Sequence, residues 1–137
     1  MTELTGMQIV EQFIESSPFP ALVGLKLENI EEDHVVMTLP FRNELITIGT
    51  VVHGGAIATL IDSAASCAGW ATSNPPENMR GTTVALNVSY LAAADQTDLR
   101  AEAKVLRRGK MLSFIDVDVT NGDGRLVAKG SATYKLG

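Results

Sequence analysis

The chain has 137 residues, of which 45% are hydrophobic and 20% are charged, and its formal net charge at pH 7 is −5. These values predict one globular domain, residues 1–137, and the negative charge argues against a nucleic-acid partner. A membrane span is not expected, because every apolar run of roughly 18 residues contains Asp62 or several glycines. Cys67 is the only cysteine, which excludes an internal disulfide and fits a reducing cytoplasm.

The first third of the chain predicts one helix followed by two strands. Apolar residues recur at helical spacing over residues 5–16, with Thr5 as the candidate N-cap. Ser17–Pro20 ends this helix, because proline cannot continue it. Two strands and an irregular apolar stretch follow, over residues 22–31, 34–40 and 45–52.

The most apolar stretch of the chain, residues 56–70, predicts a buried helix. Its small and straight-chain residues favour a helix, and a helix that is apolar nearly all round belongs in a core. Between Glu44 and Glu77 the only formally charged side chain is Asp62. Burying a lone carboxylate is costly unless it is paired or hydrogen-bonded. Asp62 is therefore a candidate functional residue, and the alternative is a structural acid that is hydrogen-bonded to Ser or Thr neighbours.

The last part of the chain predicts four consecutive strands in an antiparallel meander. The predicted strands cover residues 82–91, 98–106, 111–120 and 125–134. In the first of them, strict alternation places Thr83 on the face opposite to Val84 and Leu86. A sheet wrapped around one apolar helix follows, which is an α+β layer arrangement.

Other motifs have simpler structural explanations. Asp116–Thr120 matches a phosphatase nucleophile motif by its letters, but period-two alternation explains it without any chemistry. His34 and His53 have no carboxylate or cysteine at metal-ligand spacing, so no metal site is expected. Cys67 lies inside the apolar helix and is expected to pack there rather than act as a nucleophile.

The start of the long helix offers a complement to Asp62. A helix N-terminus presents unpaired N–H groups and a partial positive charge, and the glycines at Gly54 and Gly55 let a carbonyl oxygen approach them. Eight residues separate Gly54 from Asp62, which is about 12 Å along a helix. One carbonyl cannot contact both. If the two groups cooperate, they come from two antiparallel copies of the helix, so the sequence predicts a homodimer with shared active sites.

These segments together resemble the hotdog-fold acyl-CoA thioesterases of the phenylacetate-degradation (PaaI-like) type. The resemblance is carried by Val52–Gly55 with Ala56–Asp62, then Gly81–Val84, Asn87–Tyr90, Arg108–Lys110 and Gly124–Gly130. It implies a curved antiparallel sheet wrapped around a long central apolar helix, with a short N-terminal helix. It also implies dimers that join their sheets, and commonly dimers of dimers.

The resemblance assigns a role to each candidate site residue. Asp62 is the nucleophile or the general base, the Gly54 N–H of the neighbouring subunit is the oxyanion donor, and Thr83 positions the water or the substrate. The resemblance also assigns substrate binding to His53, Gly55, Thr47 and Tyr90. It assigns contact with the CoA moiety to Arg107, Arg108, Gly109 and Lys110. Relatives often carry an asparagine where this chain has Thr47, so side-chain support for the oxyanion differs here.

The expected activity is hydrolysis of an acyl-CoA thioester to a free acid and CoA, with no metal or redox cofactor. The CoA is part of the substrate, and neither a nucleic acid nor a membrane is an expected partner. Two alternatives stay open from the residues. One is an enoyl- or hydroxyacyl-CoA hydratase, for which His53 is the one candidate histidine. The other is a non-catalytic acyl-CoA-binding or regulatory module. The basic residues at 107–110 also have a plain alternative, a solvated hairpin turn.

Overall fold

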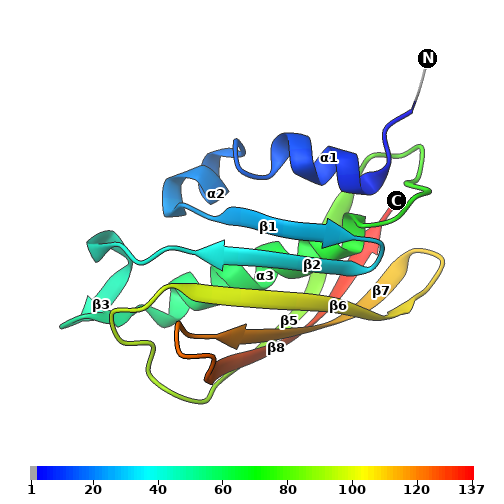
Figure 1. The fold of residues 1–137 in the computed structure, drawn as a ribbon. Coiled ribbons are helices and arrows are strands. Elements are labelled where there is room, and N and C mark those ends of the chain that lie inside the picture. The colour runs from blue at the N-terminus through cyan, green and yellow to red at the C-terminus, as the bar shows by residue number, and fades with distance from the viewer. Residues whose placement is uncertain (1–2) are drawn as a thin grey trace.

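The structure is a computed structural model that describes residues 3–137 and shows a long helix partly enclosed by an antiparallel sheet (Figure 1). The helices are α1 (Gly6–Phe13), α2 (Pro18–Val23) and α3 (Gly54–Trp70), with the 3-10 turn η1 (Asn43–Leu45). The strands are β1 (Lys26–Glu31), β2 (His34–Leu39), β3 (Ile46–Ile48), β4 (Val51–Val52), β5 (Gly81–Tyr90), β6 (Leu99–Arg108), β7 (Leu112–Thr120) and β8 (Leu126–Leu136). The predicted α+β architecture is confirmed. Within residues 3–137, no helix has both the length and the apolar character needed to cross a membrane.

The N-terminal segment contains two helices where the sequence predicted one. Thr5 is the N-cap of α1 as predicted, and its side chain accepts the Gln8 N–H at 3.2 Å while the Gln8 amide oxygen accepts the Thr5 N–H at 2.8 Å. The predicted strand at 22–31 is wrong in its first part, because α2 occupies it. Proline is favourable at the start of a helix, and Gly24, with φ of 85°, ends α2. Strand β1 therefore starts four residues later than predicted.

The main sheet has the strand order β1-β2-β6-β7-β8-β5. The four last strands are antiparallel as predicted, but only β6, β7 and β8 form a meander. Strand β5 lies at the edge beside β8, so within the described residues its outer edge has no partner strand. Val84, Leu86 and Tyr90 of this edge strand are 57%, 39% and 53% exposed. An unpaired edge with apolar side chains is a ready surface for pairing with another strand.

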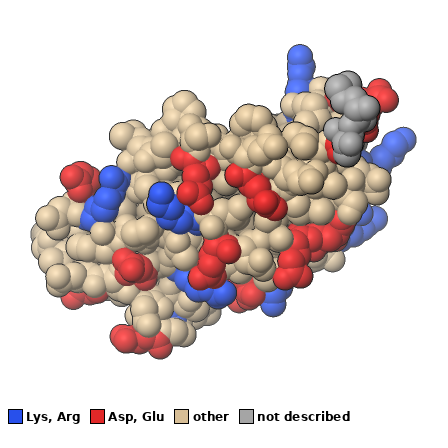
Figure 2. Space-filling model, turned by 45° about the horizontal axis from the view of Figure 1, so that its top comes forward, with Lys and Arg blue, Asp and Glu red and all other residues tan. Residues whose placement is uncertain are grey.

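Helix α3 is the centre of the core, as its sequence predicted. Leu60, Ile61 and Ala64 are fully buried against the concave face of the sheet. The approach is close at Gly130 of β8, where a Cβ atom would overlap the Ile61 side chain. Helix α1 packs against α3 and β1 and covers one side of the central helix (Figure 1). The face of the molecule shown in Figure 2 carries acidic and basic side chains intermixed rather than gathered by sign.

A β-bulge in β5 turns Thr83 toward α3. The register of β5 against β8 shifts between Thr83 and Ala85, which makes Val84 an extra residue. Thr83 consequently pairs with the buried Tyr134 and lies on the same face as Leu86. The prediction from strict alternation, which put Thr83 and Leu86 on opposite faces, is therefore wrong.

A second bulge in β6 has the same effect on Arg108. The register of β6 against β7 shifts between Val105 and Arg107, and Leu106 is the extra residue. Arg108 consequently pairs with the buried Ser113 and faces the concave side of the sheet. The bulge also extends β6 through both arginines, so the turn that the sequence placed at 107–110 begins only after Arg108.

Candidate functional site

The start of α3 is held by two side chains that leave one N–H free. His53 is the N-cap, and its Nδ1 accepts the Gly55 N–H at 2.8 Å. The Tyr90 hydroxyl donates to the Gly54 carbonyl at 2.7 Å. A Cβ on Gly55 would lie 2.9 Å from His53 Nδ1, so this cap requires glycine. The Gly54 N–H donates to no group within residues 3–137 and is available to an incoming oxygen atom.

Asp62 lies in the middle of α3 and is paired with a hydroxyl group. The Thr83 hydroxyl donates to Asp62 Oδ1 at 2.7 Å, and the Asp62 residue is half-buried. Ser66, one helical turn further along, has its Oγ 3.5 Å from Thr83 Oγ1 and donates to the Asp62 carbonyl at 2.8 Å. Ser66 is not among the residues predicted from the sequence, although its position four residues after Asp62 puts both on one helix face.

The structure brings the predicted residues together in two groups rather than one. His53, Gly54, Gly55 and Tyr90 meet at the start of α3, whereas Asp62 and Thr83 meet two turns later. The rise of the helix places these groups about 12 Å apart, which is the separation that the sequence implied. Thr47 joins neither group: it is exposed in β3, and its side chain makes no hydrogen bond within the described part of the chain.

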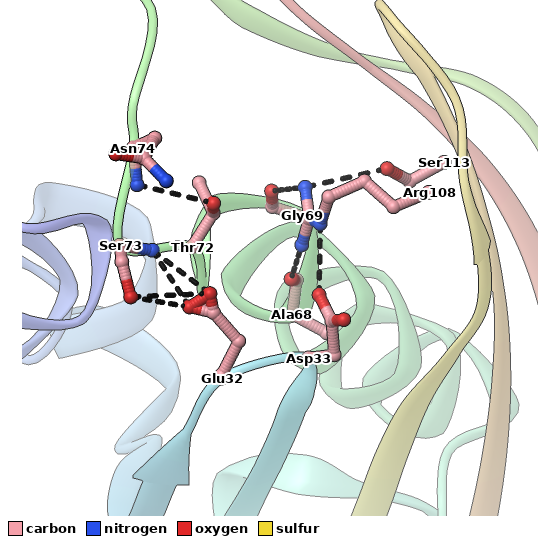
Figure 3. A network of polar contacts seen from close by, with 9 residues as sticks. All are labelled: Glu32, Asp33, Ala68, Gly69, Thr72, Ser73, Asn74, Arg108 and Ser113. Atoms are coloured by element: carbon pink, nitrogen blue, oxygen red, sulfur yellow. Dashed lines mark hydrogen bonds and ion pairs between the residues drawn. The ribbon is translucent and has the colours of Figure 1, made fainter.

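The Arg108 side chain reaches from β6 to the end of α3 (Figure 3) and is only 24% exposed. Its Nη1 and Nη2 donate to the carbonyls of Gly69 and Ala68 at 2.9 and 3.0 Å, and its Nε donates to Asp33 Oδ1 at 2.8 Å. Ser113 lies at 3.4 Å from Nη1. A cation is favourable at a helix C-terminus, where the carbonyls are unpaired. Arg108 therefore acts as a cap on the helix that carries Asp62.

The rest of the basic turn lies beside that cap and faces outward. Arg107 and Lys110 are exposed, and the Gly109 N–H closes the turn with a 2.8 Å hydrogen bond to a backbone carbonyl. The loop after α3 is held to the turn between β1 and β2, where the Ser73 N–H donates to the Glu32 carboxylate at 2.7 Å (Figure 3). Asn74 of this loop lines a pocket together with Lys110 of the basic turn. Neither Arg107 nor Lys110 makes an ion pair within residues 3–137, so the turn presents two cations near the C-terminal end of α3.

Comparison with known proteins identifies the family. The family model described as "Thioesterase superfamily" matches residues 49–128, which include both halves of the site. The chain belongs to the thioesterase superfamily. It is 30% identical to the medium/long-chain acyl-CoA thioesterase YigI of Salmonella typhimurium, over 93% of this chain and 90% of that protein.

Two solved structures are similar to this thioesterase over most of its length. Zebrafish thioesterase superfamily member 2 has a TM-score of 0.82 and 29% identity, with 98% of this chain and 100% of that chain covered. A hypothetical thioesterase from Streptococcus pneumoniae, crystallised with coenzyme A, has a TM-score of 0.73 and 25% identity, with 82% and 85% covered. The predicted hotdog fold is confirmed, and the protein is a thioester hydrolase.

Two further side chains near Asp62, those of Cys67 and Tyr134, are buried. Burial raises the pKa of the Cys67 thiol to about 12, so this residue stays protonated and packs in the core. Burial also raises the pKa of Tyr134, whose hydroxyl oxygen accepts the Trp70 Nε1–H at 2.9 Å. No cluster of three or more His, Cys, Asp or Glu side chains in the described part of the chain is arranged to hold a metal ion.

Proposed function

We propose that this thioesterase hydrolyses an acyl-CoA to the free carboxylic acid and CoA. The observation that carries the proposal is the pairing of the half-buried Asp62 with the Thr83 hydroxyl, on the same helix that starts with a free Gly54 N–H. The printed names of two similar proteins support the substrate class, since one is a medium/long-chain acyl-CoA thioesterase and the other was crystallised with coenzyme A.

The reaction needs one carboxylate and one oxyanion donor. Asp62 either attacks the thioester carbon itself or removes a proton from a water molecule that attacks it. The negative charge that develops on the carbonyl oxygen is stabilised by the Gly54 N–H and the positive end of α3. The C–S bond then breaks, CoA leaves as a thiolate and takes up a proton, and water supplies the second oxygen of the acid. The Thr83 hydroxyl orients the Asp62 carboxylate through its 2.7 Å hydrogen bond.

We propose that the complete site is formed by two subunits. Helix geometry keeps Gly54 about 12 Å from Asp62 in one chain, and the free edge of β5 runs beside α3. Pairing of two β5 edges would place the two α3 helices side by side and antiparallel, with Gly54 of the partner subunit opposite Asp62. The exposed Leu86 and Tyr90 would be buried in this interface.

Two such dimers have a further apolar surface available on the outer face of the sheet. Leu106 and Phe114 are 71% and 41% exposed there, in a hollow of about 350 Å³ that continues onto β5 at Ala85. Because this hollow adjoins the β5 edge, two copies of it would meet at the dimer axis. We propose that a dimer of dimers associates through it.

The CoA part of the substrate is assigned to the exposed side of the basic turn. Arg107 and Lys110 are free to make charge-assisted contacts with phosphate groups, while Arg108 and Gly109 hold the turn in place. Thr47 is assigned to substrate binding, and His53 and Gly55 to shaping the helix start around the thioester. The unpaired, buried Cys67 supports a reducing cytoplasm as the compartment.

The catalytic proposal is tested by release of free thiol from a panel of acyl-CoAs. Asp62→Asn should lower kcat by on the order of 10²–10⁴-fold, because the base or nucleophile is lost. Thr83→Val should lower it by about tenfold, since one hydrogen bond that orients the carboxylate is removed. Asp123→Asn, in an exposed hairpin turn, is the matched control and should leave the rate unchanged. Turnover by Asp62→Asn at the parent rate would contradict the proposal.

The assembly is tested separately by sedimentation. Leu86→Glu should give an inactive monomer, because it puts a charge into the β5 interface. Leu106→Glu should leave an active dimer, because it affects only the outer hollow. A monomeric parent protein with full activity would contradict the shared site.

A further inference from the structure

An apolar cleft separates α1 from α3 on the side of the central helix that carries Asp62. It has a volume of about 200 Å³, and the side chains of Ile9, Phe13, Cys67 and Trp70 contribute to its walls. None of its lining residues carries a formal charge at neutral pH, since Cys67 is fully buried and stays a thiol. The cleft is therefore a surface that favours an uncharged, apolar occupant.

The cleft begins next to the reacting groups. Ser66 lines it, and the Oγ of Ser66 lies 3.5 Å from the Thr83 Oγ1 that donates to Asp62. Asp62, Ser66 and Trp70 follow one another at intervals of four residues, so they form one stripe along α3. A chain that leaves the thioester carbonyl beside Asp62 and follows this stripe enters the cleft directly.

We propose that this cleft holds the acyl chain of the substrate and that Phe13 and Ile9 of α1 set its preferred length. The proposal rests on the proposed acyl-CoA hydrolysis and specifies its substrate class as straight-chain acyl groups of medium length. It gives α1 a function beyond covering the core, since α1 forms the outer wall of the cleft.

The distance along α3 from Asp62 to Trp70 gives the expected length of the acyl chain. Asp62 and Trp70 are eight residues apart, which is about 12 Å along the helix axis. An extended hydrocarbon advances about 1.25 Å per bond, given a C–C bond of about 1.5 Å and a bond angle of about 111°. The distance therefore fits an acyl chain of about ten carbons.

A second hollow adjoins the cleft at α1. It has a volume of about 500 Å³, is lined in part by Leu4, Pro76 and Met79, and shares Ile9 and Phe13 with the cleft. Longer chains would pass over these two residues into this larger hollow, whose lining also includes the carboxylates of Glu3 and Glu77. We expect the benefit of added carbons to level off there, because a wider space with charged side chains in its lining favours an apolar chain less than the cleft does.

The test is kcat/KM for acetyl-, butyryl-, hexanoyl-, octanoyl-, decanoyl-, dodecanoyl- and palmitoyl-CoA, with phenylacetyl-CoA for comparison. We expect kcat/KM to rise with chain length by up to about fourfold per buried methylene and to level off near decanoyl-CoA. Phe13→Ala should lower the value for decanoyl-CoA by on the order of fivefold while leaving acetyl-CoA unchanged, because only the long chain reaches this wall. Ile9→Trp, which fills the cleft, should move the optimum to shorter chains.

Phe19→Ala is the matched control, because Phe19 is 55% exposed and Phe13 is 56% exposed, and both lie on N-terminal helices. Phe19→Ala should leave kcat/KM unchanged for every acyl-CoA in the series. Equal profiles for Phe13→Ala and Phe19→Ala, or a preference for acetyl- or phenylacetyl-CoA, would overturn the inference while acyl-CoA hydrolysis stands. If no acyl-CoA is hydrolysed but calorimetric binding of decanoyl-CoA still depends on Phe13, the proposed function fails and the cleft assignment stands. If neither hydrolysis nor such binding is seen, both are wrong.

Discussion

Replacing Arg108 with methionine should destabilise the protein, because this residue caps the helix that carries Asp62. The guanidinium makes hydrogen bonds of 2.9 and 3.0 Å to the carbonyls of Gly69 and Ala68, and both residues are buried. Leaving such groups without a partner costs about 1–3 kcal/mol for each. The ion pair with Asp33, whose side chain is 41% exposed, adds less than about 1 kcal/mol.

The expected loss of stability is about 3 kcal/mol. For a domain of this length the melting temperature should then fall by about 10 °C, as measured by calorimetry or circular dichroism. Arg108→Lys should recover only part of this, because a single ammonium group cannot donate to three separated acceptors in the way a planar guanidinium does.

Arg107→Met is the control, because it removes the neighbouring cation, which is exposed. It should change the melting temperature by less than about 2 °C and raise KM for acyl-CoA. The opposite result for Arg108→Met, an unchanged melting temperature with a raised KM, would refute its role as a cap and make it a CoA ligand.

Three further changes test other parts of the structure. A hydrogen bond from His34 is the main cause that lowers the pKa of Glu102; burial acts in the opposite direction, and the charge of Lys104 lowers the pKa further. The stabilisation from these contacts is therefore fully present above about pH 4.3 and is lost as the pH falls through the lowered pKa. Glu102→Gln should consequently reduce the dependence of the melting temperature on pH at acid pH. Gly130→Ala should cost about 1–3 kcal/mol in the free energy of unfolding, measured with urea, because its methyl group would overlap a buried side chain. Cys67, whose pKa burial raises to about 12, should react with a thiol reagent only as fast as the protein opens, and fast labelling in native buffer would contradict its burial.

The central helix and Asp62 could be predicted because their signals are local. A long apolar segment with a single acid stands out in the printed sequence, and the rise per residue fixes the distance from Gly54 without any coordinates. The short helix α2 was also within reach, because Pro18 follows a serine and Gly24 lies at the expected end. The apolar pair Leu22–Val23 hides it, because these residues also fit the start of a strand.

The orientations of Thr83 and Arg108 could not be predicted from alternation. Thr83 and Arg108 fall on the inner face of their strands only when the extra residue, Val84 or Leu106, is left out of the alternation. Valine and leucine are common in regular strands, so nothing in the sequence marks these two residues as bulged. The bulges become visible only in the pairing of β5 with β8 and of β6 with β7. Non-local pairing decides their register, whereas a sequence pattern reports only local periodicity.

The bulge at Val84 means that the contact between Thr83 and Asp62 does not depend on the exact length of β5. Removing this one residue would restore regular alternation, so Thr83 would still pair with Tyr134, stay on the same face as Leu86 and remain the hydroxyl partner of Asp62. A strand that kept Val84 but lost the bulge would instead turn Thr83 to the outer face. The face on which this threonine lies is therefore decided by strand pairing and not by the number of residues that separate it from Asn87.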